Sequence, residues 1–185
     1  MAKSLQKFLK RTNLWLTLPV LTGALFGFSA LPSQYWYLNF IAFIPLLIAA
    51  EKALAFKKPL LVFSIQLFIA LAVFYLWAGR WVLQTANMGF LLGLLIVVPF
   101  VVLVSPYSLL KKRGSKFAPV YFVAAWLAAE MIQSYFQLST PFYNLGHSIA
   151  KNPKLIQWYE YTGAAGGSLW VLAVNLSLYS LGKGK

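Results

Sequence analysis

The side chains that could do chemistry in this sequence are few, and they stand apart. Glu130 lies within an apolar run and could carry a proton or bind a cationic group, whereas the sole histidine, His147, precedes Ser148 in a polar stretch. A serine nucleophile would need His147 and Glu160 as partners, but no nucleophile-elbow sequence frames Ser148. One histidine without a second metal-binding residue at ligand spacing makes a poor metal site. The pattern therefore predicts no catalytic residue and no metal site.

The absence of cysteine narrows the chemistry further. It excludes thiolate nucleophiles, thiolate metal ligands and disulfides together. The sequence also has no glycine loop that could cradle a phosphate and no paired carboxylates, so we expect no cofactor. Two interpretations of Glu130 stay open, a functional carboxyl facing a cavity and a structural carboxyl hydrogen-bonded to a neighbouring helix, and we favour the second. Asn175, in the last apolar run, is expected to hydrogen-bond between helices.

The composition of the chain indicates the kind of fold in which these residues lie. The chain has 185 residues, of which 61% are hydrophobic and 10% charged, and its mean hydropathy is +0.72. About a quarter of the residues of a soluble domain would be charged, so the sequence predicts an all-α integral membrane protein with residues 1–185 as a single membrane domain. The apolar runs lack the alternation of barrel strands, so they should be helices. Six spans are expected, at roughly 14–31, 36–50, 59–79, 89–110, 117–137 and 161–181.

The basic residues predict the orientation of this six-helix bundle. All of the 16 lysines and arginines except Arg80, Lys151 and Lys154 fall before the first span or in the segments that lie on the same side. By the positive-inside rule both termini should be cytoplasmic. The net charge of +13 is then a topology signal, and no nucleic acid is expected as a partner. A short basic helix at residues 3–10, lying on anionic headgroups, is a further expectation.

A group of basic and aromatic residues on the predicted outer side could contact lipid. Arg80 and Trp81 place a cation beside an indole, an arrangement that suits a lipid phosphate, although snorkelling of the arginine is a competing interpretation. Phe142, Tyr143 and Trp158 lie on the same predicted side. These five residues are the candidate lipid-binding residues, with phospholipid as the candidate ligand.

Small residues and prolines should shape the helices. Gly23 and Gly27, like Gly163 and Gly167, have the four-residue spacing that allows helices to approach closely. We interpret both pairs as packing within the bundle, with dimerisation as the alternative. Prolines that should kink or end helices are Pro45, Pro99, Pro106 and Pro119.

Several motifs in order resemble one known family. The stretch TPFYNLGHS at 140–148 and the stretch QWYEYTGAAGGSLW at 157–170, followed by Asn175, resemble the region that precedes the catalytic domain in apolipoprotein N-acyltransferases, particularly the Bacteroidota form. GFSALP at 27–32, the Trp-Val and Asn-Met-Gly pieces within 81–89, and Ala-Trp with a glutamate within 125–130 are similar to earlier parts of that family. The resemblance covers essentially the whole chain.

The resemblance implies a place and a function. Family members transfer an acyl chain from phospholipid to the amino group of a lipoprotein's diacylglyceryl-cysteine, through a thioester on a cysteine of a nitrilase-like domain. It implies a multi-pass protein of the bacterial cytoplasmic (inner) membrane. These residues have no cysteine and no such domain, and the GKGK ending is typical of a finished cytoplasmic tail. The leading hypothesis is therefore a non-catalytic accessory subunit that binds membrane lipids or another membrane protein in a complex.

Two other interpretations remain open. The chain could be the membrane half of a split or truncated apolipoprotein N-acyltransferase, whose separate nitrilase-like chain would supply the nucleophile. A small transporter or channel has less support. Only Glu130 is a plausible ionisable residue at membrane depth, and no inverted repeat is evident.

Overall fold

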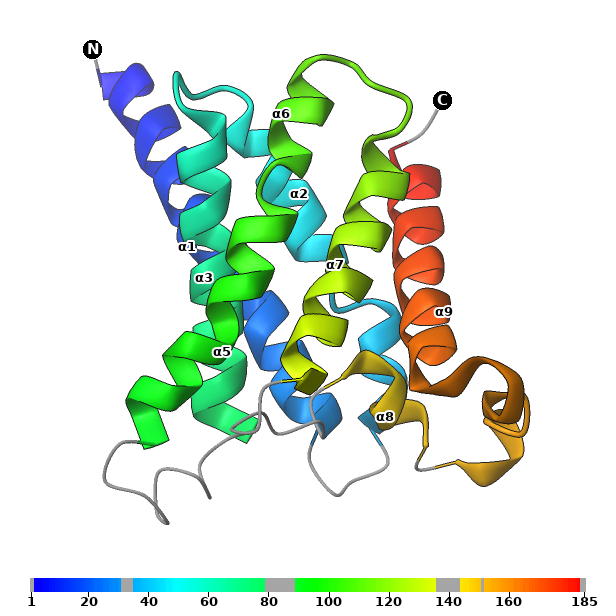
Figure 1. Cartoon of the computed structure of the whole chain (residues 1–185). Helices are drawn as coiled ribbons and strands as arrows, with labels where there is room; N and C mark the ends of the chain where they lie inside the picture. Colours follow the sequence, from blue (N-terminus) through cyan, green and yellow to red (C-terminus); the bar gives the residue numbers. More distant parts are fainter. Residues whose placement is uncertain (1, 31–34, 79–88, 136–143, 151, 184–185) are drawn as a thin grey trace.

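The structure is a computed structural model that describes residues 2–30, 35–78, 89–135, 144–150 and 152–183, with side chains described from Trp15 onward and, after residue 78, from Leu95. It is 84% helix, and the described residues include no strand. Helices run up and down beside one another and form one bundle (Figure 1). The elements are α1 (Ala2–Ala30), η1 (Tyr35–Phe40), α2 (Ile44–Ala53), α3 (Pro59–Ala78), α5 (Gly89–Val104), α6 (Tyr107–Lys112), α7 (Ala118–Tyr135), α8 (Leu145–Ile149), η3 (Pro153–Leu155) and α9 (Tyr159–Gly182).

Length and apolarity identify the chain as a membrane protein. Among the described residues, four helical segments are long and apolar enough to cross a bilayer: Tyr35–Ala53, Pro59–Ala78, Leu95–Lys112 and Tyr159–Gly182. The segment Trp15–Ala30 is a shorter apolar helix. Helix α7 carries Glu130 and Gln133, which lower its hydropathy. Six spans therefore remain a prediction, whereas the described residues form an all-helical fold with four candidate membrane-spanning helices.

Two predicted spans contain breaks. The expected span at 36–50 consists of η1 and α2, joined by a turn at residues 41–43. The expected span at 89–110 ends as α5 at Val104 and resumes as α6 after Pro106, where a proline cannot donate the backbone hydrogen bond that a continuous helix needs. By contrast, Pro99 lies inside α5 without ending it.

Helix α1 is continuous from Ala2, so residues 3–10 extend the first apolar helix and do not form the separate surface helix that we expected.

An aromatic cluster forms the centre of the bundle. Phe43 in the turn before α2 contacts Trp126 of α7 with ring centroids 4.6 Å apart, and it contacts Phe26 of α1 at 4.8 Å. Trp126 also contacts Phe100 of α5 at 4.8 Å. The pairs with Phe43 meet edge to face, an arrangement that favours aromatic pairs beyond the area they bury. Four helical elements thus converge on one apolar centre.

The glycines of α1 allow close packing against α3. A Cβ added at Gly23 would lie 2.7 Å from Val73 Cβ, and one added at Gly27 would lie 2.8 Å from Trp77 Cγ. Real Cβ atoms do not approach other atoms so closely, so only glycine permits this contact. The prediction that this pair packs within the bundle is confirmed.

Both termini lie at one end of the bundle, and α8 lies at the other (Figure 1). At the terminal end Glu51 of α2 pairs with Lys111 of α6, with Nζ 3.4 Å from Oε1, and also with Lys183 after α9. Lys111 Nζ also donates to the Tyr179 hydroxyl at 3.0 Å. These contacts tie α2, α6 and α9 together. Placement of this end in the cytoplasm remains a prediction.

Candidate functional site

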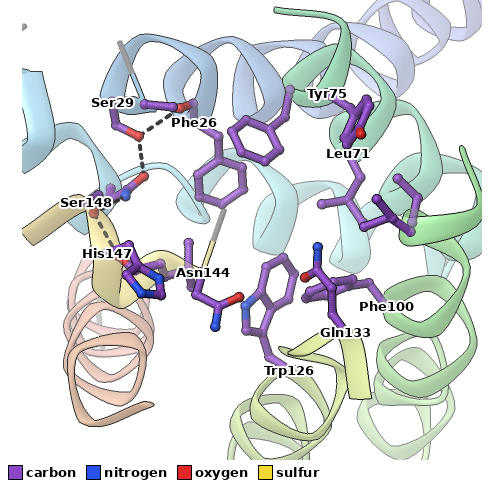
Figure 2. Close-up of a pocket in the computed structure, with 16 residues that line it drawn as sticks. Phe26, Ser29, Leu71, Tyr75, Phe100, Trp126, Gln133, Asn144, His147 and Ser148 are labelled. Carbon is purple, nitrogen blue, oxygen red and sulfur yellow. Dashed lines mark hydrogen bonds between the residues drawn. The ribbon is translucent and has the colours of Figure 1, made fainter. Parts of the chain in front are cut away.

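A cavity of about 100 Å³ lies among α1, α3, α5, α7 and α8. Its lining residues come from the half of the bundle that contains α8, and Figure 2 shows them as sticks. Ser29, His147 and Ser148 lie on one side of it, and Leu71 and Phe100 lie opposite. The apolar lining also includes Phe26, Phe74, Ile96, Val97 and Trp126, and the polar lining also includes Asn39, Gln133 and Asn144.

Asn175 of α9 stabilises, by hydrogen bonds, the break between η1 and α2. The turn leaves the N–H of Phe43 and the carbonyl of Asn39 without partners in a helix. Asn175 Oδ1 accepts from Phe43 N at 2.9 Å, and its Nδ2 donates to Asn39 O at 2.7 Å. Asn175 is fully buried, so it supplies hydrogen bonds that water cannot reach. The expected role between helices is what the structure shows for this residue.

A short polar chain leads from this break to the cavity. The Ser29 hydroxyl donates to Asn39 Oδ1 at 2.6 Å, and Asn39 Nδ2 donates to Ser148 Oγ at 2.5 Å. Ser148 in turn donates to Leu145 O at 2.7 Å. The Ser148 hydroxyl is therefore engaged with Asn39 and Leu145. This arrangement links α1, η1 and α8 along the polar side of the cavity and does not form a serine nucleophile with a base.

Glu130 links α7 to α8 through hydrogen bonds. Its Oε1 accepts from Trp126 Nε1 at 3.0 Å and from the backbone N–H of Leu145 at 3.0 Å, and the Ser168 side chain is a further polar neighbour. Leu145 is the first residue of α8, so the side-chain oxygen of Glu130 satisfies a backbone donor that has no partner inside that helix. The geometry favours the structural interpretation of Glu130 over a proton carrier.

Helices α8 and α9 touch at small residues. The Tyr159 hydroxyl donates to Gly146 O at 2.8 Å, and Gly146 N donates to Ser168 Oγ at 2.9 Å. A Cβ added at Gly167 would lie 2.9 Å from Gly146 Cα. Gly167 therefore lies at a close approach, as we expected.

Gly163 is different, and its assignment to helix packing is wrong. Its φ is 62° and its ψ is −169°, and it marks a kink inside α9. A Cβ added there would meet nothing within 4 Å. A left-handed φ is strained for residues with a side chain, so glycine is needed here for its backbone conformation and not for contact with another helix.

Replacing Gly146 with alanine is expected to lower the free energy of unfolding by about 1–3 kcal/mol, the usual cost of overpacking. The added Cβ would collide with the carbonyl oxygen of Ala164, which belongs to the backbone and cannot move aside cheaply. SDS titration in mixed micelles measures the effect. Gly182→Ala is the matched control, because its Cβ meets nothing within 4 Å. Equal stability of the two variants would contradict the close α8–α9 contact.

Two lining residues carry polar atoms without partners. Asn144 Oδ1 and His147 Nδ1 are buried and have no hydrogen-bond partner in the part of the chain that the structure describes. Both residues line the cavity (Figure 2). Burial lowers the pKa of His147 below its usual value, so its imidazole is neutral at neutral pH. A neutral imidazole has one nitrogen that accepts a hydrogen bond and one that donates.

Of the five predicted lipid-contact residues, the structure describes only Trp158. Arg80, Trp81, Phe142 and Tyr143 lie outside the described residues. Trp158 lies just before α9, where its Nε1 donates to Leu155 O at 2.7 Å and its ring centroid lies 6.0 Å from that of Trp170. It does not line the cavity. Sequence reasoning did not identify Asn39, Asn144 or His147 as a group, although two of them fall in the stretch TPFYNLGHS.

The apolar helices, the buried polar contacts and the cavity together define a helical membrane domain. Residues 22–177 match the family described as the apolipoprotein N-acyltransferase N-terminal domain. Because the match covers most of the chain, the chain belongs to this family. No curated protein and no solved structure matches the chain. The resemblance found in the sequence is thus confirmed, and the 185 residues contain no nitrilase-like domain.

Proposed function

We propose that these residues act as a non-catalytic membrane domain that binds membrane lipid and associates with another membrane protein. The family membership carries the proposal, since the matched domain is the membrane part of an N-acyltransferase. The absence of cysteine supports a role without a covalent step in this chain. Localisation in the bacterial inner membrane, with six spans and cytoplasmic termini, belongs to the same proposal.

A second candidate follows from the same membership. The bundle would be the membrane half of an apolipoprotein N-acyltransferase whose nitrilase-like part is a separate chain. Phospholipid would then be the acyl donor, and the thioester would form on the partner. The two candidates differ in the partner's chemistry, so identification of the partner separates them.

Lipid binding is tested at Arg80 and Trp81. Exchange of both for alanine is expected to lower the amount of co-purified phospholipid about tenfold, which corresponds to about 1.4 kcal/mol, because a charge-assisted contact to phosphate is lost. Native mass spectrometry of the chain released from nanodiscs measures it.

Lys154→Ala is the matched control. Lys154 is exposed and lies on the same predicted side as Arg80, so its loss should leave the bound phospholipid unchanged. If the double variant keeps the phospholipid of the unmodified chain, Arg80 and Trp81 are not lipid contacts.

A further inference from the structure

The described residues that line the cavity beside α8 are polar on one side, and none of them carries a formal charge. Among the sixteen described residues that line it, none is Lys, Arg, Asp or Glu. His147 is neutral at neutral pH for the reason given above. A phosphate or an ammonium group placed here would therefore be desolvated without a counter-charge, which is strongly unfavourable. The described lining therefore favours an uncharged ligand over a charged one.

The polar side offers hydrogen-bond acceptors. Asn144 Oδ1 is an amide oxygen, which accepts hydrogen bonds, and His147 Nδ1 accepts in the tautomer that carries its proton on Nε2. Both atoms are buried and have no hydrogen-bond partner among the described residues. Buried polar atoms in folded proteins are nearly always satisfied by protein, water or ligand. Both residues line the cavity. A hydroxyl group is the uncharged donor that would satisfy them.

The opposite side favours hydrocarbon. Phe26, Leu71, Val97 and Phe100 contribute rings and branched chains to the wall. The volume of about 100 Å³ is smaller than that of an engineered apolar cavity of about 150 Å³ that holds benzene, so it has room for a few heavy atoms. Water could fill only the polar side favourably. A short polar end followed by methylene groups would match both sides.

From this lining we propose that the cavity binds the uncharged, hydroxyl-bearing end of an amphiphile, with the hydroxyl bonded to Asn144 or His147 and the first methylenes against the aromatic wall. The proposal rests on the lipid-binding role proposed above and deepens it by naming the ligand's chemistry. It differs from the Arg80 contact, which suits a charged phosphate.

The sole histidine makes the test specific. With a purification tag that lacks histidine, the chain labelled with ¹⁵N-histidine has ring signals from His147 alone. Three probes of equal chain length are added to nanodiscs that contain the labelled chain: dodecan-1-ol, methyl laurate and dodecyl phosphate. Dodecan-1-ol is expected to shift the His147 ring signals with saturation. Methyl laurate, which has no donor, and dodecyl phosphate, which is charged, are expected to shift them at least tenfold more weakly.

Variants locate the binding to the cavity. Val97→Phe fills the cavity and should abolish the shift by dodecan-1-ol, whereas Val98→Phe is the matched control on the same helix. Val98 is 47% exposed and does not line the cavity. Asn144→Leu removes one acceptor and should weaken the titration about tenfold. The comparison of the three probes needs no variant, so it tests the proposal even if Val97→Phe does not fold.

Two results would overturn the proposal: an equal shift by the ester and the alcohol, or no shift by the alcohol in a folded chain. The phospholipid that co-purifies with the chain is measured on the same samples. If the alcohol fails while phospholipid is retained, the cavity proposal is overturned and the lipid-binding role is unaffected. If the alcohol does not bind and no phospholipid co-purifies, both are overturned.

Discussion

Replacing Glu130 with alanine is expected to lower the free energy of unfolding by about 2–6 kcal/mol, since each buried donor left without an acceptor costs about 1–3 kcal/mol. The two donors are Trp126 Nε1 and the N–H of Leu145. Glu130 is only 4% exposed, so water cannot replace the lost oxygen. The loss should also release α8 from α7. SDS titration in mixed micelles gives the unfolding energy, and limited proteolysis near residue 145 reports the release of α8.

Glu130→Gln is the matched control. Glutamine keeps an oxygen at the same distance from the backbone, so it can accept both hydrogen bonds. We therefore expect its stability and its bound phospholipid to stay close to those of the unmodified chain. Loss of phospholipid in a stable Glu130→Gln variant would show that the carboxyl itself is needed, and the structural assignment of Glu130 would then be wrong.

Asn175→Leu is expected to destabilise the bundle by a similar amount, about 2–6 kcal/mol. Leucine has nearly the same size but leaves the N–H of Phe43 and the carbonyl of Asn39 unsatisfied in the break before α2. Phe43 is central to the aromatic cluster, so its movement would loosen the contact with Trp126. Tryptophan fluorescence together with SDS titration measures both effects.

The control for this variant is Ser180→Ala on the same helix. The Ser180 hydroxyl is exposed and donates only to Ser177 O within α9, so its removal should change stability by less than about 0.5 kcal/mol. If Asn175→Leu were as stable as Ser180→Ala, the break would not depend on Asn175.

Much of the fold could be predicted because apolar runs report burial in lipid directly. The runs at 59–79 and 161–181 correspond closely to α3 and α9. The break within 36–50 was predicted only in part. Pro45 was expected to kink or end a helix, and it lies in the first turn of α2, whereas the stabilising hydrogen bonds come from Asn175, which is more than 130 residues away in sequence. Long-range hydrogen bonds of this kind leave no local pattern.

The candidate site was predicted less well for a related physical reason. Glu130 and Asn175 are recognisable because polar residues inside apolar runs need partners. The cavity requires five helices to meet, and no spacing within one segment reveals it. The role of Gly163 could not be predicted from the sequence. The four-residue spacing of glycines is compatible both with a helix contact and with a kink at positive φ.

The proposed function requires that this chain acts with a partner protein and not alone. The most direct measurement is purification of the tagged chain from its native membrane in mild detergent, followed by identification of stoichiometric companions. We expect a membrane protein at about one copy per chain. A companion with a Glu-Lys-Cys nitrilase-like domain would assign the chain to a split acyltransferase, and a membrane complex without such a domain would assign it to an accessory role. A chain that purifies without any partner would contradict the proposed association with another membrane protein.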